Sequence, residues 1–221
     1  MGLALLAILA AGAWSLRRSP DPLPGFPTTI LFADDRAEDL RFLDPKTTGV
    51  AYLARTVILG ATGIVVRPRL SPLQYPPGTT LMAVVRIEFT DRALPPYANV
   101  IPVLLPAAAG AAGLQIDFDE ADRYPYWYQA LLTDLRRALP AGKPLSIAVK
   151  ASWCSAGSWV DGLPVAEATP LLFRAQGDPV LPICRSSSGV WNGDRPPNVR
   201  RLYWFHPLPW TAAAVEKISA R

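Results

Sequence analysis

The sequence predicts an α/β fold with parallel strands, because strand-like and helix-like patterns alternate along the middle of the chain. The strand-like runs occupy 81–89, 114–119, 145–153 and 167–174. Between the second and third runs, segment 124–139 has apolar residues at helical spacing and is bounded by prolines. Successive runs are far enough apart for crossover connections, which join parallel strands with a right-handed turn.

The rest of the chain adds further elements to what is expected to be one domain. A length of 221 residues favours a single domain, and the 24 prolines and 50% hydrophobic content indicate a loop-rich globule with a real core. Another helix is expected within 94–112, and the last segment, 211–221, is expected to form a surface helix. The remaining strand-like segments are 28–33, 50–58, 63–69, 180–184 and 201–206.

Residues 1–19 are predicted to target the protein rather than to fold with it. Gly2 to Leu16 form an apolar run of about signal-peptide length, shorter than the ~20 residues of a spanning helix. No basic residue precedes this run, whereas Arg17 and Arg18 follow it. Three interpretations stay open: a signal peptide whose start lies upstream, a short uncleaved membrane anchor, or a buried helix. The first two interpretations both imply that the protein is exported.

Proline content sets the expected domain boundary. Segment 20–27 contains four prolines and is interpreted as a linker, because proline restricts its own backbone and that of the preceding residue. A single α/β barrel-like domain is then expected over 28–221. After export, Cys154 and Cys184 would meet an oxidising compartment in which they could form a disulfide; two buried thiols are the alternative.

The two faces of the strands favour a barrel over an open sheet. Because side chains alternate, apolar residues share one face of 114–119, and Asp117 and Asp119 share the other. The same alternation separates Arg86 and Glu88 from the apolar residues of their strand. Polar residues on one face fit a barrel interior, whereas an open sheet covered by helices is apolar on both faces. The sequence thus predicts a trimmed or irregular TIM-like (β/α) barrel, shorter than the ~250 residues typical of that fold.

Charged residues gather toward the carboxyl ends of these strands, where such barrels hold their active sites. Carboxylates are the main groups left for catalysis in a chain with one histidine and two cysteines, so Asp117, Asp119 and Glu88 are the candidate catalytic residues. The candidate substrate-binding residues are Arg86, Lys150, Trp153 and Arg174. A purely structural network of ion pairs inside the barrel is the competing interpretation.

The spacing of the two aspartates is compatible with glycoside hydrolysis. Residues two apart on a strand are separated by roughly 6–7 Å. Retaining and inverting glycosidases use carboxylates about 5 Å and ~6.5–9.5 Å apart, respectively. Glu88 from the adjacent strand could equally be the acid, and a nearby cation such as Lys150 or Arg174 would hold a carboxylate ionised.

Three segments carry a resemblance to a known family: LQIDFDE, LLTDLRRALPAGKPLSIAVKASW and VAEATPLLFR. Through them the chain resembles a bacterial family catalogued as a domain of unknown function, over roughly residues 50 to 175. The resemblance implies an exported barrel protein related to glycoside hydrolases. The resemblance implies site roles for five residues. Asp117 and Asp119 belong to the QIDFD motif, Arg86 and Glu88 belong to the VVRIEF strand, and Trp153 is the aromatic residue at a strand end.

A looser similarity connects the same strand to chitinase-type barrels, whose D-x-x-D-x-D-x-E motif ends in a general acid. The position of that acid is Ala121 in this chain, and Glu120 is one residue away from it. The sequence therefore departs from the chitinase pattern at its general acid.

Other chemistries have less support. No G-x-S-x-G motif accompanies His206, so this histidine is expected in a loop. No zinc site is expected from so few His and Cys, and no nucleotide cofactor is indicated, because a P-loop and a G-x-G-x-x-G motif are both absent. The net charge of +4 is spread without a basic block, which argues against nucleic acid binding. Trp153 and Trp159 could stack on sugars, although aromatic residues are more often core.

Two hypotheses about function follow. In the first, an exported glycosidase-like barrel acts on or binds a carbohydrate through its strand-end carboxylates. In the second, a noncatalytic envelope protein, a binding or structural module, uses the same charges to brace its interior. In both, contact with a membrane is expected only through the N-terminal segment. Carboxylates that converge in an open cleft favour the first hypothesis, and carboxylates that are buried and paired favour the second.

Overall fold

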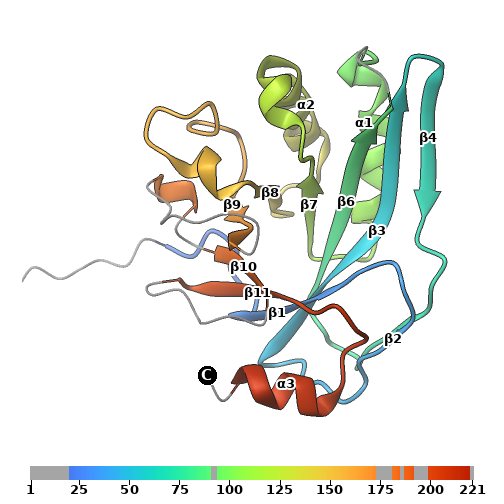
Figure 1. Cartoon of the computed structure of the whole chain (residues 1–221), viewed down its shortest axis with the longest axis vertical. Helices are drawn as coiled ribbons and strands as arrows, with labels where there is room; N and C mark the ends of the chain where they lie inside the picture. Colours follow the sequence, from blue (N-terminus) through green and yellow to red (C-terminus); the bar gives the residue numbers. More distant parts are fainter. Residues whose placement is uncertain (1–19, 91–93, 173–180, 185–186, 192–198, 220–221) are drawn as a thin grey trace, which may run out of the picture.

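A curled sheet of parallel strands forms the body of the protein (Figure 1). The structure, a computed structural model, describes residues 20–90, 94–172, 181–184, 187–191 and 199–219. Within them the main sheet has nine strands, of which β4 (Gly63–Pro68) is antiparallel to its neighbour and the other eight are parallel. In sheet order the parallel strands are β1 (Thr29–Ala33), β3 (Thr48–Gly60), β6 (Leu81–Phe89), β7 (Gly113–Asp117), β8 (Leu145–Val149), β9 (Glu167–Pro170), β10 (Ser187–Trp191) and β11 (Arg201–Phe205), which returns to β1.

The sheet closes on itself between β9 and β10. One parallel bridge joins Leu171, which follows β9, to Gly189 of β10. A Cβ atom at position 189 would lie 2.6 Å from Leu171 Cδ2 and 3.1 Å from Phe205 Cε2, so a larger residue would have to displace these side chains. Strands that follow one another around a closed parallel sheet define a barrel. The predicted trimmed or irregular TIM-like barrel is confirmed.

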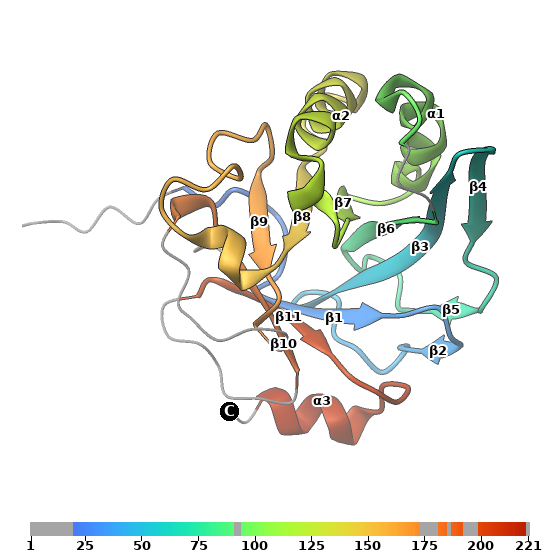
Figure 2. The same cartoon turned by 45° about the horizontal axis from the view of Figure 1, so that its top comes forward.

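Helices cover only part of the outside of the barrel. Figure 2 shows α1 and α2 on one side and α3 on the opposite side. The longest, α2 (Pro125–Ala138), packs Tyr128, Leu131, Leu132 and Leu135 toward the sheet. The other α-helices of the described residues are α1 (Ile101–Leu104) and α3 (Ala212–Ser219). The 3-10 turns whose bounds fall within the described residues are η1 (Tyr97–Asn99), η2 (Leu105–Ala108), η3 (Ala121–Arg123), η4 (Ala151–Cys154) and η6 (Pro182–Cys184).

Several strand predictions differ from the structure. The strands expected over 114–119 and 145–153 end earlier, at Asp117 and Val149, so Asp119 lies in a turn after β7 and Trp153 lies in the 3-10 turn η4. Segment 63–69 does form a strand, β4, but it pairs antiparallel with β3 as the second arm of a hairpin outside the barrel order. Segment 180–184 is wrong as a strand, because Pro182–Cys184 is a 3-10 turn and the barrel strand β10 begins later. A small parallel pair, β2 (Glu38–Asp39) with β5 (Leu73–Gln74), was not expected.

Alternation along the strands sorts the apolar side chains into two cores. The larger core lies between the sheet and its outer cover, and contains Val85 of β6 and Ile116 of β7. The smaller core comes from the opposite faces of the strands and fills the interior, with Leu23, Phe26, Ile30, Phe32, Ala51, Leu53, Met82, Val84 and Tyr203. The apolar faces predicted for 81–89 and 114–119 are thus the outer faces.

The amino-terminal end of the barrel is closed by residues that were expected to be a linker. Leu23 and Phe26 are buried in the inner core, and the carboxylate of Asp21 accepts hydrogen bonds from Arg201. Much of 20–27 therefore belongs to the folded domain, because its apolar side chains fill the base of the barrel. Residues 1–19 lie outside the described residues. In the described parts, no helix combines the length and apolar character needed to cross a membrane.

An ion pair is buried just inside this base. Arg201 and Glu167 are fully buried, with Nη1 of the arginine 3.1 Å from Oε2 of the glutamate. The hydroxyl of Tyr203 donates to Oε1 of Glu167 at 2.7 Å. Burial, and then the Glu167 carboxylate, raises the pKa of Tyr203 well above its usual value, so this phenol stays a donor. Arg201, Glu167 and Tyr203 are therefore hydrogen-bonded to one another. They lie at the amino-terminal end of the barrel, opposite the end that holds active sites, so their role is structural.

A polar layer fills the middle of the interior. The amide nitrogen of Gln115 donates to Ser146 Oγ at 3.1 Å and to Thr169 Oγ1 at 3.3 Å. These side chains come from β7, β8 and β9 and are all buried. The base and the middle of the barrel are therefore filled with side chains. Interior-facing side chains can contact a ligand only at the carboxyl-terminal mouth.

A disulfide joins Cys154 and Cys184, which settles the alternatives left open by the sequence. Their Cα atoms are 6.0 Å apart, and 30 positions separate them in the chain. The disulfide encloses a chain segment that contains β9. It therefore holds together the region in which the β-bridge between Leu171 and Gly189 closes the barrel. It constrains the unfolded chain over the same segment.

Replacing Cys154 by serine is expected to lower the free energy of unfolding by about 3 kcal/mol, because a cross-link over this loop length removes chain entropy from the unfolded state. Chemical denaturation without reductant measures the loss. Cys184→Ser should give the same value, and the double variant should add nothing. Equal stability of the oxidised wild type and the variants would contradict the assignment.

Asp21→Asn is expected to destabilise the protein by about 1 kcal/mol at pH 7, because a partly exposed charge pair is weak but here gains hydrogen bonds. Burial raises the pKa of Asp21, but the Leu23 N–H and Arg201 lower it more, so the folded-state pKa lies below 3.8. The stabilisation is therefore complete above that value and is lost as the pH falls below it. Urea unfolding at pH 7 and pH 3 should show a difference that shrinks at the lower pH; a constant difference would refute it.

Candidate functional site

A small pocket lies at the carboxyl ends of β6 and β7. Its volume is about 220 Å³, and its described lining residues are Arg86, Ile87, Glu88, Phe89, Asp117, Asp119 and Glu120. The three predicted catalytic carboxylates and Arg86 are therefore brought together at the barrel mouth. Enzymes built on parallel (β/α) barrels place their active sites at this end.

Strand register explains how Arg86 and Asp117 meet. The two residues are paired neighbours in β6 and β7, and both belong to the faces that point to the interior. Nε of Arg86 lies 3.2 Å from Oδ2 of Asp117. A guanidinium at this distance favours the ionised form of a carboxylate.

Asp34 is a second partner of Arg86 that the sequence reasoning missed. It follows β1, and its Oδ1 lies 3.9 Å from Nη1 of Arg86. Burial lowers the pKa of Arg86, but the carboxylates of Asp117 and Asp34 raise it more, so the arginine stays charged. The missed signal was an acidic residue at a strand end, two positions beyond the inward-facing Phe32, as in the β7 motif.

The carboxylates of the pocket differ in exposure. The side chain of Asp117 is 13% exposed, whereas Glu88 and Asp119 are exposed residues. Asp117 therefore forms the floor of the pocket, and Glu88 and Asp119 form its rim. Within the described ranges, no three His, Cys, Asp or Glu residues are grouped so that they could hold a metal ion.

Lys150 and Trp153 form a separate cluster after β8. Nζ of Lys150 and Nε1 of Trp153 each lie 3.3 Å from Oδ2 of Asp122. Trp153 is 6% exposed and packs edge-on against Trp159, so its ring offers no open face to a sugar. Trp153 is thus a core residue, and its predicted role in binding substrate gains no support from this position; Arg174 lies outside the described residues.

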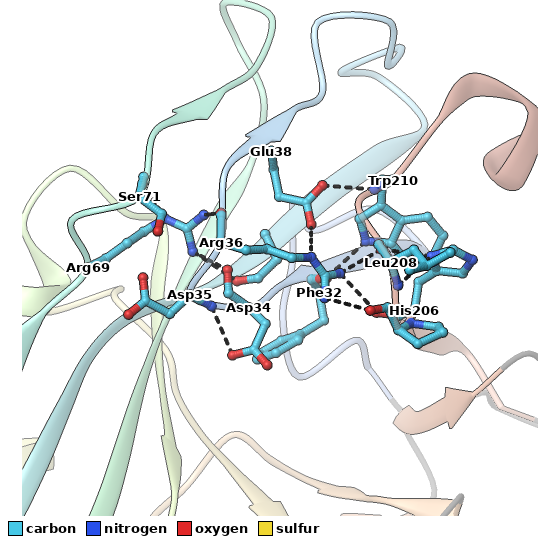
Figure 3. Close-up of polar contacts among 12 residues, drawn as sticks. Phe32, Asp34, Asp35, Arg36, Glu38, Arg69, Ser71, His206, Leu208 and Trp210 are labelled. Carbon is cyan, nitrogen blue, oxygen red and sulfur yellow. Dashed lines mark hydrogen bonds and ion pairs between the residues drawn. The ribbon is translucent and has the colours of Figure 1, made fainter.

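Arg36 and Glu38 fasten the loop that follows β1 to the segment after β11 (Figure 3). Nε of Arg36 is 2.7 Å from Oε1 of the fully buried Glu38 carboxylate. The same guanidinium donates to the carbonyl oxygens of residues 206–208. Oε2 of Glu38 accepts from the backbone N–H of Trp210 at 2.8 Å. We call these contacts the rim clamp.

His206 belongs to this rim as a loop residue, as predicted. It follows β11, and its ring lies 5.0 Å from that of Trp210. Its carbonyl oxygen accepts from Arg36, and its Nδ1 contacts Leu208. These contacts position the loop that follows β11.

Glu38→Gln is expected to lower the free energy of unfolding by about 1–3 kcal/mol, because it weakens two hydrogen bonds to a buried charged group. Thermal or urea unfolding checks the loss. Asp39→Asn is the matched control on the next residue: Arg41 lowers the pKa of Asp39 to about 2, but the pair is fully exposed and should leave stability unchanged. Equal effects of the two substitutions would contradict the rim clamp.

Comparisons with protein-family profiles, curated protein sequences and solved structures found no match to this chain. The resemblance to the bacterial family with the QIDFD strand therefore stays a prediction. The fold and the barrel mouth described above are the basis for inferring function.

Proposed function

We propose that the protein is an exported barrel that binds a carbohydrate at its mouth and hydrolyses a glycosidic bond there. The observation that carries the proposal is the convergence of Glu88, Asp117 and Asp119 around one open pocket. Paired carboxylates at a strand-end pocket are the groups that glycoside hydrolysis needs. The pocket volume is below the ~300–1,000 Å³ of drug-sized sites, so it suits a small unit such as one sugar ring.

The environments of the three carboxylates suggest different roles. Asp117 lies beside Arg86, which favours its ionised form, and so it would act as nucleophile or as the base that activates water. Glu88 and Asp119, exposed at the rim, are the candidates for the acid that protonates the leaving oxygen. Asp117 would thus attack the sugar or activate the attacking water, while Glu88 or Asp119 would protonate the leaving oxygen.

The disulfide supports the exported location. Stable disulfides form in oxidising compartments and are rare in the cytosol. Cys154 and Cys184 are paired, and the apolar run before Arg17 resembles the core of a signal peptide. Cleavage of this run and its retention as a short anchor are both compatible with export.

A second candidate is a noncatalytic envelope module, for binding or structure, on the same barrel. It is favoured by one observation, the double pairing of Arg86 with Asp117 and Asp34, which could simply brace the mouth. Such a module would keep the ion pairs but would turn over no substrate.

The test is hydrolysis of a panel of polysaccharides and chromogenic glycosides by the full chain with its disulfide formed. Asp117→Asn, and at least one of Asp119→Asn and Glu88→Gln, should lower kcat by about 10²–10⁴-fold, because acid and base contributions have this size. Asp134→Asn is the control, since this carboxylate lies on α2 in an exposed pair with Arg137.

Two outcomes would decide against hydrolysis. Unchanged turnover in all three mouth variants would remove these carboxylates from the reaction. A wild type without turnover, whose melting temperature falls on Asp117→Asn but not on Asp134→Asn, would favour the noncatalytic module.

A further inference from the structure

Arg86 is the one cation among the described residues that line the mouth pocket, and its charge is already compensated. Its guanidinium lies between Asp117 at 3.2 Å and Asp34 at 3.9 Å. Glu88, on the same strand, adds a further negative charge in its surroundings. Arginine often recognises a carboxylate through paired hydrogen bonds, but Nε of Arg86 already donates to Asp117 and its Nη1 lies at ion-pair distance from Asp34.

The backbone of Asp34 is held by contacts that do not involve Arg86 (Figure 3). The guanidinium of Arg69 donates to the carbonyl oxygens of Ala33, Asp34 and Arg36, and also to that of Ser71 at 2.9 Å. These bonds join the loop after β1 to the segment between β4 and β5. A ligand that approached Arg86 would therefore not displace the Asp34 backbone.

The rim clamp fixes the far end of the same loop. Arg36 and Glu38 tie it to the segment after β11, and Glu38 is fully buried. The side chain of Asp34 is itself oriented, because its Oδ1 accepts from the N–H of Asp35 at 2.9 Å. Asp34 is thus a negative charge held in a fixed place beside Arg86.

We propose that Asp34 is a specificity residue that makes the pocket reject acidic sugars, so that the substrate of the proposed hydrolase is an uncharged glycan. This inference rests on the proposed function. An anionic sugar would face the carboxylates of Glu88, Asp117 and Asp119 without an uncompensated cation among the described lining residues. Like charges placed together oppose binding, whereas sugar hydroxyls can hydrogen-bond to carboxylates.

Asp34→Asn tests the role of the charge with little change in shape. The amide oxygen of asparagine can still accept from the Asp35 N–H, but the negative charge beside Arg86 is lost. The probes are glucuronate and glucose, added to the full chain. The readouts are dissociation constants from titration and the NMR signal of the Arg86 Nε–H, assigned with Arg86→Lys.

In the wild type, glucuronate should leave the Arg86 signal unchanged. In Asp34→Asn it should shift that signal and bind at least about tenfold more tightly, while glucose binding changes little. Asp35→Asn is the matched control: it removes the same charge from the next residue, which is exposed and has no ion pair with Arg86, and it should behave as the wild type.

Three results would overturn the proposal: wild-type protein that binds glucuronate at Arg86, an Arg86 signal that does not respond to Asp34→Asn, or equal effects of Asp34→Asn and Asp35→Asn. If Asp34→Asn fails to fold, Asp34→Ser, which also retains an oxygen, takes its place. None of these readouts needs turnover. Absence of hydrolysis together with the expected Arg86 response would refute the proposed catalysis alone and leave the charge compensation standing.

Discussion

Closure of a parallel sheet into a barrel is the constraint on which the rest of this structure depends. Once β9 and β10 meet at Leu171 and Gly189, every second side chain of each strand must share one interior. The space is small, so each interior position has to be apolar, hydrogen-bonded or paired. The base, the polar middle layer and the mouth are three solutions to this requirement.

The same chemistry has different consequences at the two ends of the barrel. Arg201 and Glu167 are fully buried and closed off by residues 21–26, so no ligand can reach their ion pair and its role is structural. Arg86 and Asp117 form a similar pair, but they are partly exposed and border an open pocket. Solvent access, rather than residue type, separates a structural pair from a candidate site.

The mouth also depends on loops that approach from outside the sheet. The rim clamp joins the loop after β1 to the segment after β11, and Arg69 holds the loop after β1 from the opposite side. Backbone carbonyls accept most of these hydrogen bonds, so the clamp fixes the path of the chain. These hydrogen bonds therefore hold Asp34, and with it the negative charge beside Arg86, in one position at the mouth.

The sequence by itself determined the α/β class, the long strands and the outward and inward faces of β6 and β7, because alternation is a local property of a strand. It also selected Arg86, Glu88, Asp117 and Asp119, which lie near the ends of β6 and β7 or just after them. Tertiary structure decided that Asp34 lies beside Arg86, that Trp153 is buried and that Leu23 and Phe26 of segment 20–27 fill the base of the barrel. The pairing of Cys154 with Cys184 was decided in the same way. These four outcomes depend on contacts between residues far apart in the chain. The local pattern places Asp34 at a strand end, but only the fold brings it beside Arg86.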